Sequence, residues 1–321
     1  MRQRTHYIMS WLLGGLVFAG ATACSGDDDT KSTKETEKAP VENEVKVRRL
    51  TITEADDGAA EARQALTRAS LTENGGLTAS WTANDQLTYC NLSWMQYDGQ
   101  EYVPVSGNLT ATTTAATSQF TGNVTCSAGN ELAVVYPAAT FTTNSQYTIA
   151  LSGQDGTLAG LATRFHYVYG KATVTEVTET TANATMEKMK SLLTVCKFSF
   201  KDKATGNPLP ITTLEISYGG IGGDEGTYPQ TATVAIKDDS IIKEQADVHA
   251  TGAAGSSEAL TVTCSTAQDA VYVALLPTSA QRTFSFTVTD SSGNTYSGTA
   301  KATLTEGEYV VATGLKLTQN E

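Results

Sequence analysis

Apolar residues alternate with polar ones along many short segments of this chain, and this period of two limits its fold more than any other feature. The alternation is clearest in four segments: Cys196, Phe198 and Phe200; Leu214, Ile216 and Tyr218; Val234 and Ile236; and Phe284, Phe286 and Val288. Successive side chains of a strand point to opposite faces, so the pattern predicts strands with one buried face. Gly, Asn, Asp and Ser clusters separate the segments, as turns do. The sequence therefore predicts an all-β protein.

Two stretches repeat the same order of features. Residues 131–151 run strand, Tyr136-Pro137, loop and strand, and residues 271–288 run strand, Leu276-Pro277, loop and strand. Proline has no N–H to donate, so each is expected to end a ladder of hydrogen bonds. Earlier segments alternate as well, with Leu50 and Ile52 sharing one face, and Tyr147, Ile149 and Leu151 sharing another.

The length suits two domains, and the repeated order predicts two tandem antiparallel β-sandwich domains, at about residues 45–183 and 188–321. Residues 185–193 are an exception to the alternation. Their apolar residues follow helical spacing: Met186, Met189, Leu192 and Leu193. One or two helical turns between the domains are expected there.

The first residues have the layout of a lipoprotein signal. Arg2 and Arg4 precede an apolar run at residues 8–18, which is too short to span a membrane, and small residues then lead to Cys24. We expect a signal peptide at residues 1–23 and a lipid, such as palmitate, on the thiol of Cys24. The alternative is a lone buried thiol.

An acidic, polar stretch follows Cys24. Residues 24–44 include the triplet Asp27, Asp28 and Asp29 and few residues able to form a core, which predicts a flexible tether. An acidic run directly behind a lipidated cysteine resembles the signal by which Bacteroidota place lipoproteins on the outer face of the outer membrane. The alternative is an ordinary charged linker.

Charge and cysteine spacing exclude several classes of partner. The chain has 22 basic and 34 acidic residues, a net charge of −12, so a nucleic-acid partner is not expected. The four cysteines after Cys24 form no CxxC pair and have no histidines at metal-ligand spacing, so neither metal nor cofactor is expected; they are Cys90, Cys126, Cys196 and Cys264. Each lies in a strand-like segment, which favours buried free thiols. A Cys90–Cys126 disulfide is the pairing to test first.

Several segments, in order, resemble the fimbrillin family, the subunits of type V pili of Bacteroidota. They are Ala79-Ser80-Trp81-Thr82-Ala83-Asn84-Asp85-Gln86-Leu87, Val134-Val135-Tyr136-Pro137, His166-Tyr167-Val168-Tyr169-Gly170, the strand at residues 192–200, and Leu304-Thr305-Glu306-Gly307-Glu308-Tyr309-Val310-Val311. Asn84 stands where the family usually has glycine, and asparagine is the next best residue for a left-handed turn. The resemblance spans nearly the whole chain after the tether.

The resemblance implies transthyretin-like sandwiches that mature when an arginine-specific protease removes an N-terminal segment, here including residues 45–53. The candidate cleavage points are Arg48, Arg49, Arg63 and Arg68. The groove left behind would take an extended strand from another pilus subunit, because unpaired backbone groups along a sheet edge are costly. The alternative is that these arginines are merely exposed.

The candidate donor strand is residues 309–317, with side chains that could fill pockets: Tyr309, Val311, Leu315 and Leu317. The alternative is an ordinary last strand paired within its own domain. The sequence does not distinguish a stalk, tip or anchor subunit. Asp239-Ser240-Ile241 also resembles the short O-glycosylation signal of these bacteria.

Catalytic patterns are not found in the sequence, so no enzyme is expected. His166 and His249 lie far apart without local companions, and no GxSxG elbow occurs. The loop at residues 219–223 lacks the lysine and the helix of a phosphate loop. The expected function is that of a surface-exposed, lipid-anchored lipoprotein of the cell outer membrane, acting as a structural subunit or adhesin of a fimbria.

Three aromatic residues support an alternative function. Trp94, Tyr97 and Tyr102 lie close together among polar residues, and aromatic faces beside hydrogen-bonding groups suit sugar stacking. A surface glycan-binding lipoprotein, with host or bacterial surface ligands, is therefore the second hypothesis. The same residues would also suit a hairpin with one buried face.

Overall fold

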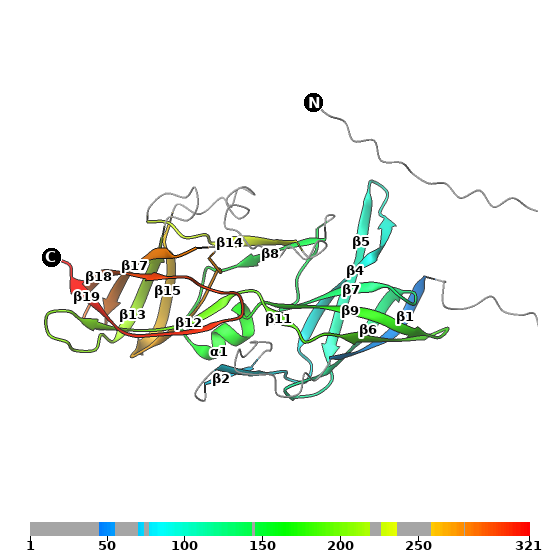
Figure 1. Cartoon of the computed structure of the whole chain (residues 1–321), viewed down its shortest axis with the longest axis horizontal. Coiled ribbons are helices and arrows are strands. Elements are labelled where there is room, and N and C mark those ends of the chain that lie inside the picture. The colour runs from blue at the N-terminus through cyan, green and yellow to red at the C-terminus, as the bar shows by residue number, and fades with distance from the viewer. Residues whose placement is uncertain are drawn as a thin grey trace, which may run out of the picture. The chain divides into compact units, whose positions relative to one another are not determined.

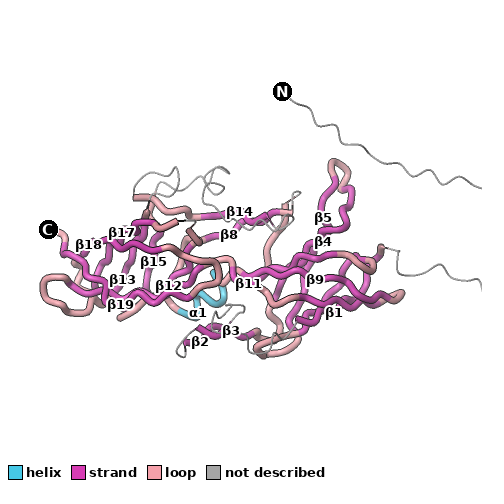
Figure 2. Tube along the Cα trace, viewed as in Figure 1, coloured by secondary structure: helices cyan, strands magenta, loops and turns pink. Residues whose placement is uncertain are grey.

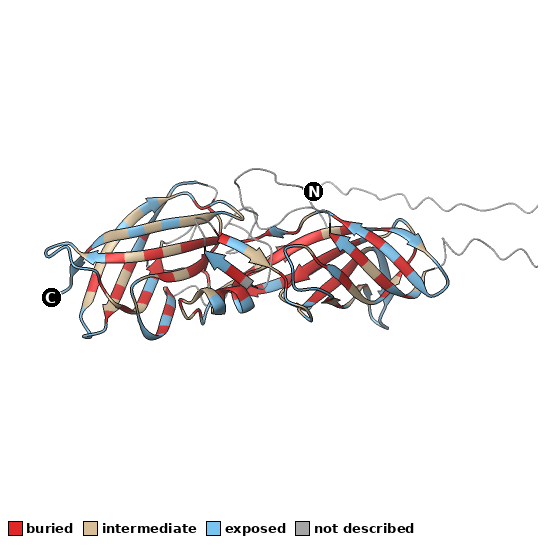
Figure 3. Cartoon of the chain, turned by 90° about the horizontal axis from the view of Figure 1, so that it is seen from below, coloured by how far each residue is buried: buried red, intermediate tan, exposed pale blue. Residues whose placement is uncertain are grey.

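The structure is a computed structural model that describes residues 45–54, 70–73, 77–142, 145–218, 226–235, 258–278 and 280–321. Nearly all regular structure in these ranges is strand (Figure 2), with one helical segment at residues 158–165. Buried and exposed residues alternate along many strands (Figure 3), as the sequence predicts. The all-β prediction is confirmed.

The N-terminal domain is built around a closed ring of strands (Figure 1). In spatial order these are β10 (Thr181–Met186), β1 (Lys46–Glu54), β6 (Gln119–Cys126), β5 (Tyr102–Ala111), β4 (Gln86–Tyr97), β7 (Glu131–Tyr136) and β9 (Val168–Val177). β9 also pairs with β10, which closes the ring, and the short β11 (Lys190–Ser191) extends β9. β1 and β10 run parallel, whereas β1 and β6 run antiparallel. β1 is therefore bonded on both sides.

Apolar side chains fill the inside of this ring. Trp81 is fully buried, and its ring makes edge contacts with Phe120 at 4.9 Å and with Tyr136 at 5.5 Å between centroids. Leu50 and Ile52 of β1 belong to the same core cluster. The turn after Trp81 includes Asn84 at φ 76°, as expected from the left-handed turn in the sequence.

The C-terminal domain consists of two sheets that the last strand joins. One sheet has the order β15 (Leu260–Gln268), β13 (Ile211–Ser217), β17 (Arg282–Asp290) and β18 (Thr295–Ala302). The other places β12 (Thr194–Asp202) between β16 (Val271–Leu275) and β19 (Tyr309–Gln319). β19 pairs with β12 in parallel and with β18 in antiparallel orientation. A strand that passes from one sheet to the other is a usual way to make a sandwich corner.

Segments from the first half of the chain also contribute to the C-terminal core. Two small two-stranded sheets lie in this region: the hairpin of β2 (Ser70–Glu73) with β3 (Leu77–Ser80), and the pair of β8 (Gln146–Ala150) with the distant β14 (Thr231–Ala235). Leu71 and Tyr147 belong to the same buried cluster as Phe286. The buried Gln154 side chain exchanges hydrogen bonds with Ala274, at 2.9 and 2.8 Å. The domain division at residues 183–188 stays a prediction.

The helical turns lie elsewhere than the sequence predicts. The prediction for residues 185–193 was wrong, because this stretch contains the end of β10 and then β11. Its apolar residues are buried on strands and their connections, so their spacing reflects irregular packing rather than a helix. The helical segment instead comprises α1 (Leu158–Gly160) and the π-helical η2 (Leu161–Phe165), capped by Thr157, whose hydroxyl accepts from Gly160 N.

Candidate functional site

β1 occupies a slot in the ring between β6 and β10. Its register pairs eight of its residues with β6 and six with β10. The sequence Lys46–Glu54 alternates, so four of its side chains point inward and are buried: Arg48, Leu50, Ile52 and Glu54. We call the space that β1 fills, between Gln119–Cys126 of β6 and Thr181–Met186 of β10, the β1 slot.

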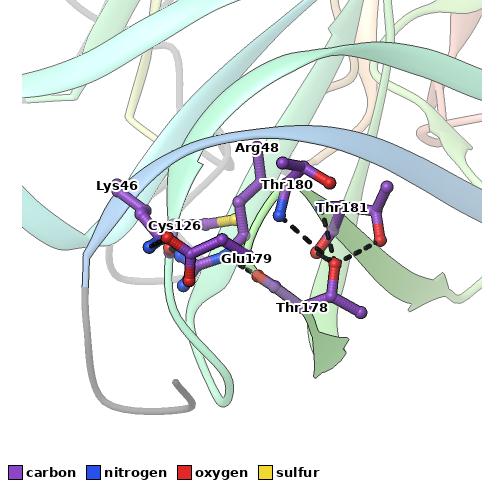
Figure 4. A network of polar contacts seen from close by, with 7 residues as sticks. All are labelled: Lys46, Arg48, Cys126, Thr178, Glu179, Thr180 and Thr181. Atoms are coloured by element: carbon purple, nitrogen blue, oxygen red, sulfur yellow. Dashed lines mark hydrogen bonds and ion pairs between the residues drawn. The ribbon is translucent and has the colours of Figure 1, made fainter. Parts of the chain in front are cut away.

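One end of the β1 slot receives a buried guanidinium (Figure 4). Arg48 is 1% exposed; its Nε donates to Thr178 O at 2.7 Å and its Nη1 donates to Cys126 O. Beside it, Lys46 and Glu179 form an ion pair at 2.5 Å. Desolvating a guanidinium is costly, and charge-assisted hydrogen bonds of this kind offset the cost. This end of the slot therefore presents acceptors to whatever side chain enters it.

The other end of the β1 slot receives a buried carboxylate. Glu54 is 4% exposed; it accepts from Trp81 Nε1 at 3.2 Å and from the backbone N of Met189 at 3.3 Å. An indole N–H and a backbone N–H are donors only, so both need an acceptor when buried. The slot thus has acceptors at one end, donors at the other, and the apolar positions of Leu50 and Ile52 between them.

The candidate cleavage points differ in access. Arg48 is buried, and Arg49, although exposed, is a Cα partner of Asn123 on β6 and of Thr181 on β10. A protease needs an extended, unpaired segment, so pairing shields both arginines while β1 is in place. Arg63 and Arg68 lie outside the described residues, as does the lipidation candidate Cys24.

The candidate donor strand β19 fully buries fewer side chains than β1 does. Leu317 is buried, Tyr309 and Leu315 are half-buried, and Val311 is 54% exposed. β19 pairs with β18 through two residue pairs, Tyr296 with Gln319 and Ser297 with Thr318. Its ladder with β12 contains an irregularity, where Gly314 has φ +68° and its N donates to Ser199 Oγ. After this bulge β19 still pairs with β12 as far as Leu317, and its pairs with β18 follow at Thr318 and Gln319.

A carboxylate on β2 binds three strands of the C-terminal domain. Glu73 accepts from Lys197 Nζ at 2.7 and 2.8 Å, from the Tyr272 hydroxyl at 2.5 Å and from the Tyr309 hydroxyl at 2.9 Å. The hydrogen bonds from Lys197, and then Tyr272, lower the pKa of Glu73 to about 2. We call these four residues the Glu73 clamp. It connects the start of β19 to the hairpin that follows residues 55–69.

The Glu73 clamp was not found from the sequence. Its members come from four strands that are far apart in the chain, β2, β12, β16 and β19. Lys197 and Tyr272 are Cα partners on neighbouring strands, and the ammonium also lies 5.3 Å from the Tyr272 ring centroid. Local spacing carries no signal for such a cluster, because strand order is a property of the tertiary fold.

Comparisons with known proteins give structural matches alone. No protein-family model and no curated protein sequence matches the chain. Among solved structures it is similar to a candidate cell adhesion protein from Bacteroides uniformis, at 15% identity and a TM-score of 0.45, covering 85% of this chain and 96% of that one. A candidate cell adhesion protein from Bacteroides eggerthii matches at 14% identity and a TM-score of 0.39, covering 84% and 86%. The shaft pilin SpaA of Lactobacillus rhamnosus GG matches at 11% identity and a TM-score of 0.31, covering 87% and 99%.

The structure brings two of the three candidate glycan contacts together. Tyr97 and Tyr102 are Cα partners near the end of the β4–β5 hairpin, with ring centroids 5.4 Å apart, and they are 56% and 66% exposed. The hairpin projects from the ring (Figure 1). Trp94, 41% exposed, lies three residues before Tyr97, within a register shift of β4. The projecting pair is therefore an aromatic surface open to solvent.

The cysteines are free and buried, which confirms the prediction; they are Cys90, Cys126, Cys196 and Cys264. Burial raises the pKa of the Cys90 thiol to about 11, so it is a poor nucleophile. His166 is buried, and His249 lies outside the described residues. Among the described residues no group of His, Cys, Asp and Glu is placed to hold a metal ion, and no helix is long and apolar enough to cross a membrane.

Proposed function

We propose that the protein is a surface-exposed, lipid-anchored subunit or adhesin of a fimbria of the outer membrane, assembled by strand exchange after proteolytic maturation. The observation that carries the proposal is the place of β1. It is the first described strand, it closes the ring between β6 and β10, and the chain continues from it into residues 55–69, which include Arg63 and Arg68. A cut there would separate β1 from the chain without breaking another described strand.

Loss of β1 would leave a defect that an incoming strand can repair. The facing backbone groups of β6 and β10 would lose their partners, and the cavities of Leu50 and Ile52 would open. Burying one such side chain contributes about 1.5–3 kcal/mol, and each buried unpaired backbone group costs about as much as a lost hydrogen bond. An extended strand from a second subunit would restore both, which is the physical basis of strand addition.

The donor in this proposal is β19 of another copy, and anchoring to the outer membrane is through the lipid on Cys24. β19 contributes one fully buried side chain, Leu317, to its own domain. By comparison, β1 contributes two fully buried apolar side chains, Leu50 and Ile52. In its own domain β19 remains an ordinary strand until an open slot is available.

An arginine-specific protease tests the proposal. Treating the purified full-length protein should give one new N-terminus within residues 64–69, followed by ladders of polymers that resist heating in detergent. The Arg63→Lys/Arg68→Lys variant should stay uncut and monomeric under the same conditions. The proposed function would be contradicted by protein that is cleanly cut and remains monomeric although mass spectrometry shows that β1 has been lost.

A second candidate function is binding of surface glycans, favoured by the exposed Tyr97–Tyr102 pair. Aromatic rings held open to solvent on a projecting hairpin suit stacking against sugar rings. Retardation on native gels containing polysaccharide measures this directly. Tyr97→Ala/Tyr102→Ala should abolish retardation, and Val311→Ala, at an exposed position on another strand, should preserve it. No retardation of the parent protein would reject this function.

A further inference from the structure

The ends of the β1 slot are polar in opposite senses. At one end, Thr178 O and Cys126 O accept hydrogen bonds from Arg48. Six residues further along β1, Trp81 Nε1 and Met189 N donate to Glu54. Between the two ends are two apolar positions, those of Leu50 and Ile52.

This arrangement restricts which strand can replace β1. Trp81 is fully buried, so a replacement that puts an apolar side chain at the Glu54 position leaves two donors without an acceptor. An unsatisfied buried donor is costly, whereas a side-chain oxygen at the same place satisfies both. A slip of one residue would also turn the apolar side chains outward, because strand side chains alternate between faces.

We propose that the β1 slot selects its occupant by a three-residue pattern: two apolar residues at alternate positions, and a side-chain oxygen acceptor two residues after the second. The occupant is the end of β19 from a second copy of this chain. The inference rests on the proposed function and adds the register. Leu315 takes the place of Leu50, Leu317 that of Ile52, and Gln319 that of Glu54.

The two strands match better at one end than at the other. The Gln319 side chain carries a carbonyl oxygen that can accept from Trp81 Nε1 and Met189 N. At the opposite end Thr313 takes the place of Arg48, and its hydroxyl donates one hydrogen bond where the guanidinium donates two to the carbonyls described above. Register is therefore set at the Gln319 end. The natural sequence of β19 thus already supplies all four residues of this register: Thr313, Leu315, Leu317 and Gln319.

The pattern also fixes the direction of the incoming strand. It runs parallel to β10 and antiparallel to β6, as β1 does. Thr318 then takes the place of Thr53, whose Cα partner on β6 is Gln119. A slip of two residues would instead place Thr318 opposite Thr121, and a reversed strand with the same two leucine positions would place it opposite Asn123. The residue of β6 that lies opposite Thr318 therefore distinguishes the three arrangements: Gln119 for the proposed register, Thr121 for the slip and Asn123 for the reversed strand.

Disulfide trapping distinguishes these registers. Thr318→Cys is combined in the full-length protein with one of three changes on β6, Gln119→Cys, Thr121→Cys or Asn123→Cys, and the protein is cut with an arginine-specific protease and oxidised. Thr318, Gln119 and Asn123 are exposed and Thr121 is half-buried, so folding should be kept, and the four described native cysteines are buried. A disulfide forms when Cα atoms are about 4.4–6.8 Å apart, which excludes partners two residues away along the strand.

The expected result is an intermolecular disulfide with the Gln119→Cys partner and at most one-tenth as much with the other two. Polymers that are trapped preferentially through Thr121→Cys or Asn123→Cys would overturn the register and leave strand exchange intact. Cleanly cut protein that forms no polymer would overturn the proposed function, and the register with it.

A second measurement tests the polar selection itself. Gln319→Leu should reduce the rate or yield of polymer formation by about tenfold, because it removes the acceptor for buried donors. Gln319→Glu keeps an oxygen acceptor and should polymerise within about threefold of the parent, and Thr318→Leu, which changes the adjacent outward position, should do the same. Gln319 is exposed in its own domain, so these changes leave the subunit folded. Equal polymerisation of Gln319→Leu and the parent would overturn the selection.

Discussion

β1 and β19 each lie between two neighbouring strands, but they are held in different ways. β1 buries four of its nine side chains, two of them charged and hydrogen-bonded, and pairs along most of its length on both sides. β19 buries one of its eleven residues and shares two residue pairs with β18. The comparison teaches that β1 is anchored by its side chains, whereas β19 depends mainly on backbone pairing with β12. A strand of the second kind is better suited to leave its place.

The largest expected difference concerns the apolar positions of the two strands. Ile52→Ala should lower the free energy of unfolding by about 2–5 kcal/mol, because it leaves a cavity in a closed core. Leu315→Ala should lower it by about 1 kcal/mol, since this side chain is half-buried. Urea unfolding measured by tryptophan fluorescence gives both values. Equal losses would show that β19 is as firmly packed as β1.

The next expected effect concerns the buried cation of β1. Arg48→Met should cost about 1–3 kcal/mol, because the Thr178 and Cys126 carbonyls lose a donor. Arg49→Met, at the exposed neighbouring position, should stay within about 0.5 kcal/mol of the parent. Thermal unfolding of the two variants side by side makes this comparison. A cost at Arg49 as large as that at Arg48 would reject side-chain anchoring at this end of β1.

The smallest expected effect concerns the Glu73 clamp, which bonds the start of β19. Its ion pair is partly exposed, so Glu73→Gln should cost about 0.5 kcal/mol at neutral pH. The pKa of Glu73 is lowered from 4.5 to about 2 in the folded protein, so the contribution is present above pH 4.5 and is lost as pH falls toward 2.

Urea midpoints of the parent and of Glu73→Gln, measured from neutral pH down to about pH 2, should therefore converge. A difference that stayed constant over this range would show that Glu73 does not act through its charge. Hydrogen exchange at the amides of residues 309–312 should be faster in the variant if the clamp restrains β19, with the amides of β1 as the unaffected comparison.

Much of the fold could be predicted from the sequence because burial follows period two. Phe284, Phe286 and Val288 are all buried on β17, and the strands before Pro137 and Pro277 end at Tyr136 and Leu275. Strand order could not be predicted, since it depends on contacts between distant segments. The closed ring, the parallel β1–β10 pair and the Glu73 clamp all arise from that order.

The helical error has a local cause. Met186 and Met189 are both buried, which imitates helical spacing, but Met186 ends β10 and Met189 lies in the connection between β10 and β11. The sequence does carry a signal for the true helical segment. Thr157 is a good capping residue, and Leu161 and Phe165 follow it with a spacing of four. For the candidate site, the resemblance in the sequence pointed to residues 45–53 and 309–317, whose roles stay predictions. The buried partners of Arg48 and Glu54 could not be predicted, because they depend on the tertiary fold.

The pairing of β8 with β14 has a consequence for folding during synthesis. β14 leaves the ribosome after β9 to β13, so β8 lacks its partner strand while much of the chain is still being made. Until then, Tyr147 and Ile149 lack the strand that covers them in the finished protein. Newly made chains therefore carry an unpaired apolar strand edge, and a holdase chaperone that shields such edges would raise the yield of this protein more than that of a protein whose halves fold one after the other.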